Sequence, residues 1–128
     1  MVLDSSALVA MHFEEPGYER LFQCVGAAEN VLIGAPTLFE CALVLVRRGG
    51  PQARAVLESS IRRLGVVIVP FSEDHFHVAC DAFLRFGKGR HPAALNFGDC
   101  MAYAVATVAG MPLLYVGNDF SQTDITPA

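Results

Sequence analysis

Residues 1–13 read MVLDSSALVAMHF, and this stretch gives the first indication of the fold. Residues 1–4 are three apolar side chains followed by an aspartate, which is typical of a short buried strand. Residues 5–13 then place apolar side chains at helical spacing, until Pro16 and Gly17 interrupt the pattern. The stretch therefore predicts a strand, a turn and a helix.

The same alternation continues along the chain. Further strands are predicted at residues 31–35, 66–69 and 113–116, where short apolar runs lie between turn signals. Further helices are predicted at residues 18–28, 37–48, 51–65 and 97–109, and one opens at Ser72 with an apolar face of Phe76, Ala79, Cys80, Phe83 and Leu84. Short strands that alternate with helices predict an α/β fold, a three-layer α/β/α sandwich with a central parallel sheet.

The length and composition fit one domain over residues 1–128. A chain of this size buries enough surface for a core without disulfides or structural metals. The four cysteines form no C-x-x-C pair, which favours a reduced, cytoplasmic setting. No secretion signal is evident, and the longest apolar run, residues 31–46, is too short for a membrane span.

Hydropathy and charge bear on the partners. Hydrophobic residues make up 53% of the chain and the mean hydropathy is +0.42, so we expect a homodimer or another partner to cover apolar surface. The net charge of -4 counts against a broad basic face for nucleic acid. A basic cluster, formed by Lys88, Arg90 and His91, is either a solvated loop or a contact for nucleic acid.

Four carboxylates occupy matching places in the predicted fold. Asp4 ends the first strand, and Asp119 follows the last predicted strand. Glu40 lies in the first predicted turn of the helix after the second strand, and Asp99 in the first turn of the helix before the last strand. Because ligands of parallel sheets bind beyond the carboxyl ends of the strands, we expect these four acids to gather at one edge.

The surroundings of the acids indicate a metal site. Glu40 is the only charged residue between Val31 and Val46, and Asp99 the only one between Pro92 and Gly117. Buried carboxylates are costly unless they are paired, protonated or metal-bound, and oxygen-only ligation suits Mg²⁺ or Mn²⁺.

Helix capping is the alternative interpretation of each acid. Thr37-x-x-Glu40 matches a capping box, and Asn96-x-x-Asp99 is a close relative of one. Asp4 and Asp119 match helix N-caps, and Ser5 and Ser6 either cap the first helix or assist the acidic site. The joint placement of the four acids favours a shared site, and capping does not exclude it.

Two histidines resemble a metal-binding pair. However, His75 and His77 are two residues apart on a predicted helix, so their side chains point about 200° apart and cannot share one metal ion. We interpret both as surface residues.

Four blocks of sequence together span nearly the whole chain: MVLDSSAL at residues 1–8, TLFECA at 37–42, GKGRHPAALNFGDC at 87–100 and GNDFSQTDI at 117–125. They resemble the VapC branch of the PIN-domain ribonucleases. Two positions depart from the pattern of that family. Val116 stands where a lysine is common, and Asn118 where a second acid is common.

The resemblance implies a PIN-like α/β/α sandwich and an endoribonuclease toxin that is neutralised by a VapB-like antitoxin. It implies hydrolysis of RNA phosphodiester bonds with Mg²⁺ or Mn²⁺, which would lower the pKa of an attacking water. Position by position, Asp4 and Asp99 would be the main metal ligands, and Glu40 and Asp119 would complete the catalytic set. One or two metal ions would fit this set, and either Glu40 or Asp119 would orient the water.

Three rival functions share some of these features. A receiver domain needs an acidic pair near the first strand and an aspartate after the third, whereas Asp4 stands alone and Phe71-Ser72 follow the third strand. A phosphatase of the haloacid dehalogenase type needs D-x-D where this chain has Asp4-Ser5-Ser6. The third rival is a catalytically inactive PIN-like domain that only binds partners, and the four intact acids argue against it.

Overall fold

The computed structural model describes residues 1–128 and contains a four-stranded, fully parallel sheet in the order β3-β2-β1-β4. The strands are β1 (Val2–Leu3), β2 (Leu32–Gly34), β3 (Val67–Val69) and β4 (Leu113–Leu114). The helices are α1 (Ser5–His12), α2 (Tyr18–Ala27), α3 (Ala35–Gly49), α4 (Ala53–Arg63), α5 (Glu73–Phe86) and α6 (Phe97–Ala109). None of these helices has the length and apolar character needed to cross a membrane.

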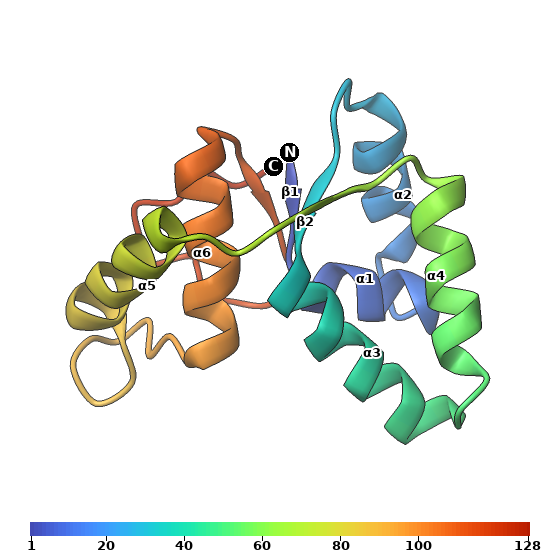
Figure 1. The fold of residues 1–128 in the computed structure, drawn as a ribbon, viewed down its shortest axis with the longest axis horizontal. Coiled ribbons are helices and arrows are strands. Elements are labelled where there is room, and N and C mark those ends of the chain that lie inside the picture. Colours follow the sequence, from blue (N-terminus) through green and yellow to red (C-terminus); the bar gives the residue numbers. More distant parts are fainter.

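The helices form two layers, one on each face of the sheet (Figure 1). Helices α1 to α4 pack on one face, and α5 and α6 pack on the other. Successive strand residues point to opposite layers: Val2 joins the α5–α6 core, whereas Leu3 joins the α1–α4 core, and both are fully buried. Each such side chain contributes roughly 1.5–3 kcal/mol by its burial. The predicted α/β/α sandwich is confirmed.

The start of α3 differs from the predicted start. The helix begins at Ala35, because Gly34 provides the N-cap and Pro36 lies in the first turn, where its missing N–H costs nothing. Thr37 is therefore inside the helix, and the predicted Thr37-x-x-Glu40 capping box does not form. The Thr37 hydroxyl is buried without a hydrogen-bond partner. Helix α4 also differs, since it begins at Ala53 and Pro51 lies in the preceding turn.

Helix α5 buries a different face from the predicted one. Its buried residues are His75, Ala79, Ala82 and Phe86, so only Ala79 of the predicted face is buried. The surface interpretation of His75 is wrong, because only 6% of this residue is exposed. Its Nδ1 accepts a hydrogen bond from the Ser72 backbone N–H at 3.1 Å and lies 2.7 Å from the Ser72 hydroxyl, which completes a capping box. His77 is exposed, as predicted.

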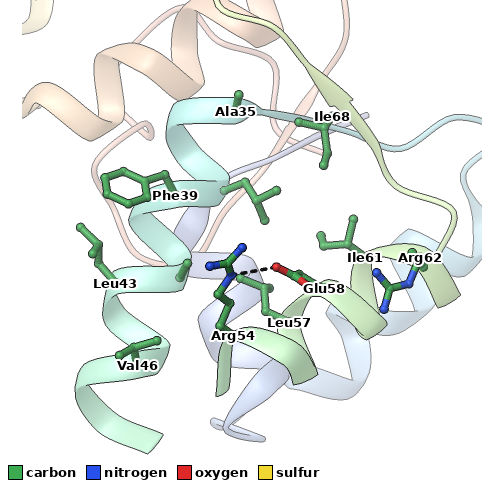
Figure 2. A pocket seen from close by; sticks show the side chains of 12 residues that line it. Ala35, Phe39, Leu43, Val46, Arg54, Leu57, Glu58, Ile61, Arg62 and Ile68 are labelled. Carbon is green, nitrogen blue, oxygen red and sulfur yellow. Dashed lines mark hydrogen bonds and ion pairs between the residues drawn. The ribbon is translucent and has the colours of Figure 1, made fainter. Parts of the chain in front are cut away.

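Seven of the twelve large apolar side chains that are exposed line two grooves. The α3–α4 groove, drawn in Figure 2, lies between α3, α4 and β3 and has the Arg54–Glu58 ion pair and Arg62 among its lining residues. The α5–α6 groove is lined only by apolar residues, which are Phe71, Phe76, Ala79, Cys80, Phe83, Leu84, Phe97, Cys100 and Met101. These grooves account for much of the apolar excess in the composition.

Candidate active site

Asp4 lies where β1 ends and α1 begins, and it is 4% exposed. It is the N-cap of α1: one carboxylate oxygen accepts hydrogen bonds from the Ser6 backbone N–H at 2.9 Å and the Ser6 hydroxyl at 2.5 Å. Burial raises the pKa of Asp4, the Ser6 hydrogen bonds oppose this, and the charge of Asp119 raises it further. The predicted capping role is confirmed, but Asp4 is buried and no basic side chain pairs with it.

Ser6 joins Asp4 to the segment that carries Asp119. While its hydroxyl donates to Asp4, its oxygen accepts a hydrogen bond from the Val116 backbone N–H at 3.0 Å. The Asp4 backbone N–H in turn donates to the Leu114 carbonyl at 2.9 Å. The positions of Asp4 and of the chain after β4 are therefore coupled by two hydrogen bonds.

Glu40 lies in the second turn of α3, not in the first turn as predicted, because the helix begins two residues before Thr37. Its side chain is partly buried and lies against Gly98 at the start of α6. Burial raises the pKa of Glu40, the charge of Asp4 adds to this, and a hydrogen bond with the Ser5 side chain opposes it.

Asp99 occupies the first turn of α6 and forms a reciprocal capping box with Asn96. The Asp99 carboxylate accepts from the Asn96 N–H at 2.7 Å, and the Asp99 N–H donates to the Asn96 side-chain oxygen at 3.1 Å. Burial raises the pKa of Asp99 to about 6 despite the Asn96 hydrogen bond, and the charges of Asp4, Asp119 and Glu40 contribute to the rise. Asp99 is thus both a cap and a member of an acidic cluster.

Asp119 lies in a turn after β4 and is exposed. No helix begins there, so the alternative that it is a helix N-cap is wrong. Its charge raises the pKa values of Asp4 and Asp99, which places it within electrostatic reach of both. The structure therefore brings the four predicted acids to the same edge of the sheet.

No basic side chain pairs with this acidic cluster. The ion pairs of the chain join other residues, namely Arg48 with Glu15, Arg54 with Glu58, His77 with Glu73 and Arg85 with Asp124. A bound cation would offset the repulsion between these partly buried carboxylates. A set of oxygen donors alone fits Mg²⁺ or Mn²⁺. No three His, Cys, Asp or Glu side chains converge closely enough to hold one ion, so a cation here would be held by at most two of these side chains and by water.

Two contacts in the site are not predicted from the sequence. The bond between Ser6 and Val116 joins residues 110 positions apart, and no local pattern indicates it. The contact between Gly98 and Glu40 has one weak signal, a glycine inside the first turn of a helix, where glycine is unfavourable.

The sequence model of the PIN-domain family matches residues 1–125 of this chain. The chain belongs to the PIN-domain family. It is 45% identical over 126 residues to Ribonuclease VapC36 of Mycobacterium tuberculosis, a match that covers 98% of this chain and 91% of the relative. It is 42% identical over 125 residues to Ribonuclease VapC30 of the same species, covering 98% of this chain and 95% of the relative. The predicted resemblance is thereby confirmed.

Solved structures of the family share this fold at low sequence identity. The toxin VapC20 of Mycobacterium tuberculosis, described as cleaving the sarcin–ricin loop, superposes with a TM-score of 0.79 at 17% identity, over 99% of this chain and 97% of that one. VapBC2 from Rickettsia felis, bound to a DNA fragment from its promoter, gives a TM-score of 0.76 at 13% identity, over 98% and 94% of the two chains. These likenesses confirm the PIN-like fold.

Proposed function

We propose that this PIN-domain chain is the toxin of a toxin–antitoxin pair and acts as a metal-dependent endoribonuclease with Asp4, Glu40, Asp99 and Asp119 as its catalytic set. The observation that carries the proposal is the gathering of four acids, without a basic partner, at the carboxyl edge of the sheet. Relatives named VapC ribonucleases, 36–45% identical over nearly the whole chain, support RNA as the substrate.

Asp4 and Asp99 would hold the metal ion. A Mg²⁺ or Mn²⁺ ion there would stabilise charge on the scissile phosphate and make water more acidic. Ser6 and Asn96 hold the two carboxylates at the starts of α1 and α6, so both ligands come from rigid elements. Glu40 and Asp119 complete the set, and one of them orients the attacking water for in-line displacement. No side-chain nucleophile is required.

The loop between α5 and α6 would contact the RNA backbone. Lys88 and Arg90 are exposed in this loop, which leads directly into the start of α6 and hence to Asp99. Their charges compensate locally for the overall charge of -4, because phosphate contacts depend on nearby lysine and arginine.

The two apolar grooves would be covered by different partners. The α5–α6 groove has an entirely apolar lining, which resembles the core of a permanent homodimer interface. The α3–α4 groove has charged residues among its lining, which is typical of an interface that also exists free, and we assign it to the antitoxin. Solved toxin–antitoxin complexes among the structures of the same fold support an antitoxin partner.

The first test of this function is cleavage of RNA. We expect the purified protein to cut a mixed pool of cellular RNAs at defined positions when millimolar Mn²⁺ is present, and new 5′ and 3′ ends to map those positions. EDTA should stop the reaction, since the carboxylates alone supply no cation. Cleavage that persists in EDTA would refute the metal mechanism, and a protein that binds its antitoxin but never cuts RNA would be the inactive partner-binding domain.

The homodimer predicts a specific effect of a single charge. Leu84 lines the α5–α6 groove and is 59% exposed, so Leu84→Glu should place a charge in the interface and shift the protein to monomer at micromolar concentration. Val56 on α4 is 50% exposed and lies outside that groove, so Val56→Glu should leave the dimer intact. Light scattering measures both masses. A monomeric wild type, or a dimeric Leu84→Glu variant, would contradict the assignment.

A further inference from the structure

The Glu40 carboxylate occupies the space that a side chain at position 98 would need. A Cβ atom added to Gly98 would lie 2.5 Å from Oε2 of Glu40, 2.7 Å from Oε1 and 2.8 Å from Cδ. Contacts this short do not occur in folded proteins, so any residue other than glycine at position 98 must displace the Glu40 side chain.

The backbone at position 98 does not itself require glycine. The glycines with positive φ are at positions 17, 50, 65, 89, 110 and 117, and Gly98 is not among them. It lies in the first turn of α6, where alanine is favoured over glycine by helix propensity. The contact with Glu40 is therefore the feature that explains a glycine here.

The contact joins the two helical layers beside the acidic cluster. Glu40 comes from α3 in one layer, and Gly98 comes from α6 in the other, directly before Asp99. A second glycine allows the same close approach, because a Cβ atom on Gly34 would lie 2.9 Å from the Val105 side chain of α6. The start of α6 also carries free backbone N–H groups and the positive end of the helix dipole, which favour a carboxylate.

We infer that Gly98 is a positioning residue whose missing side chain seats the Glu40 carboxylate against the start of α6, next to Asp99. This inference rests on the proposed function, in which Glu40 is part of the catalytic set. Gly98 would contact neither RNA nor metal, and it acts only through the place that it gives to Glu40.

The test compares Gly98→Ala with Gly26→Ala. Gly26 is also helical, has no positive φ and has no atom within 4 Å of an added Cβ, so it is a matched control. With a short RNA that carries the mapped cut site and with Mn²⁺, Gly98→Ala should lower kcat by roughly 10- to 100-fold with little change in KM. Its melting temperature in EDTA should equal or exceed that of wild type, because the displaced side chain is flexible and alanine favours the helix. Gly26→Ala should cleave like wild type.

A double-mutant cycle with Glu40→Ala separates positioning from a merely structural role. If Gly98 acts only through Glu40, Gly98→Ala should have no further effect on kcat in the Glu40→Ala background. In EDTA, Gly98→Ala should also raise the melting temperature more in the Glu40→Ala background than in wild type, because no carboxylate is displaced there. Equal effects of Gly98→Ala in both backgrounds would overturn the inference.

The two proposals fail in different ways. Full activity of Gly98→Ala beside an inactive Glu40→Ala would overturn the positioning role and leave the ribonuclease intact. A wild type that cuts no RNA, or a fully active Glu40→Ala, would overturn the proposed function or the catalytic place of Glu40. The melts in EDTA do not depend on catalysis. Even if the protein cuts no RNA, additive effects of Gly98→Ala and Glu40→Ala on the melting temperature would refute the positioning of Glu40 by Gly98.

Discussion

Asp4→Asn is expected to lower RNA cleavage by more than about 100-fold while leaving the fold intact. Asparagine has nearly the same shape, and its side-chain oxygen can still accept from the Ser6 N–H, so the cap of α1 persists. The substitution removes only the negative charge that would hold the cation. Because Asp4 is 4% exposed and no basic side chain pairs with it, the metal-free variant should be at least as stable as wild type.

The measurement is cleavage of the mapped RNA in Mn²⁺, with thermal melts of the same samples. Asp81→Asn is the matched control, because Asp81 is exposed on α5, outside the acidic cluster. It should cut like wild type. Cleavage by Asp4→Asn at the rate of wild type would remove this residue from the metal site, and a lower melting temperature would instead indicate that its cap is structural.

The elements that the sequence predicts well are those in which local and tertiary signals agree. Helix α6 has the predicted bounds, because Asn96 and Asp99 cap its start, Gly110 ends it in a left-handed conformation and residues 102–106 in its middle are buried. The acids at the ends of β1 and β4 were placed by the geometry of a parallel sheet, which gathers the carboxyl ends of its strands. The positions of these acids can therefore be predicted from the sheet topology and a few residues.

The largest error concerns the face of α5 that is buried. Helix α5 has two apolar faces, and periodicity favours the stripe of Phe76, Phe83 and Leu84 because its side chains are large. Of the predicted face only Ala79 is buried, together with Ala82 from outside that face, and Phe76 is 55% exposed. Periodicity in a single sequence does not reveal which of two apolar faces meets the core of the chain, and the surface prediction for His75 fails for the same reason.

Helix capping and membership of the acidic cluster are not alternatives. Asp4 and Asp99 each accept from the backbone N–H groups of a helix start, and each also feels the charge of the other acids. A helix start presents its cap at the carboxyl edge of the sheet, which is where the site lies. For Glu40 the capping box does not form, and its place depends on a contact with α6 that only the tertiary structure provides.

Asp99→Asn should change how stability responds to metal and to pH. Asn and Asp are comparable as partners in a helix cap, so the variant keeps the hydrogen bond from the Asn96 N–H and loses only the charge. In the folded protein the pKa of Asp99 is about 6, above its value of roughly 3.9 in an unfolded chain. The folded state therefore holds the Asp99 proton more tightly, and the stability from this group is present below pH 4 and lost as the pH rises through 6.

Asparagine resembles the protonated acid at every pH, so the metal-free variant should exceed wild type at pH 7 by about 1 kcal/mol, after allowance for solvent screening at this partly exposed site. The advantage should vanish near pH 4. Millimolar Mn²⁺ should reverse the order at pH 7, because an ion at 100 times its Kd stabilises the wild type by roughly 2.7 kcal/mol and scarcely stabilises a variant that lacks a ligand.

Thermal melts of both proteins at pH 4.5 and 7, in EDTA and in Mn²⁺, distinguish the ligand from a simple cap. If Asp99 only complements the dipole of α6, its loss should cost roughly 0.3–1 kcal/mol at pH 7 with or without metal. Both proteins would then respond to Mn²⁺ alike. Equal metal-induced shifts in melting temperature would therefore remove Asp99 from the metal site, whereas a shift confined to wild type, together with a more stable metal-free variant, would establish it as a ligand.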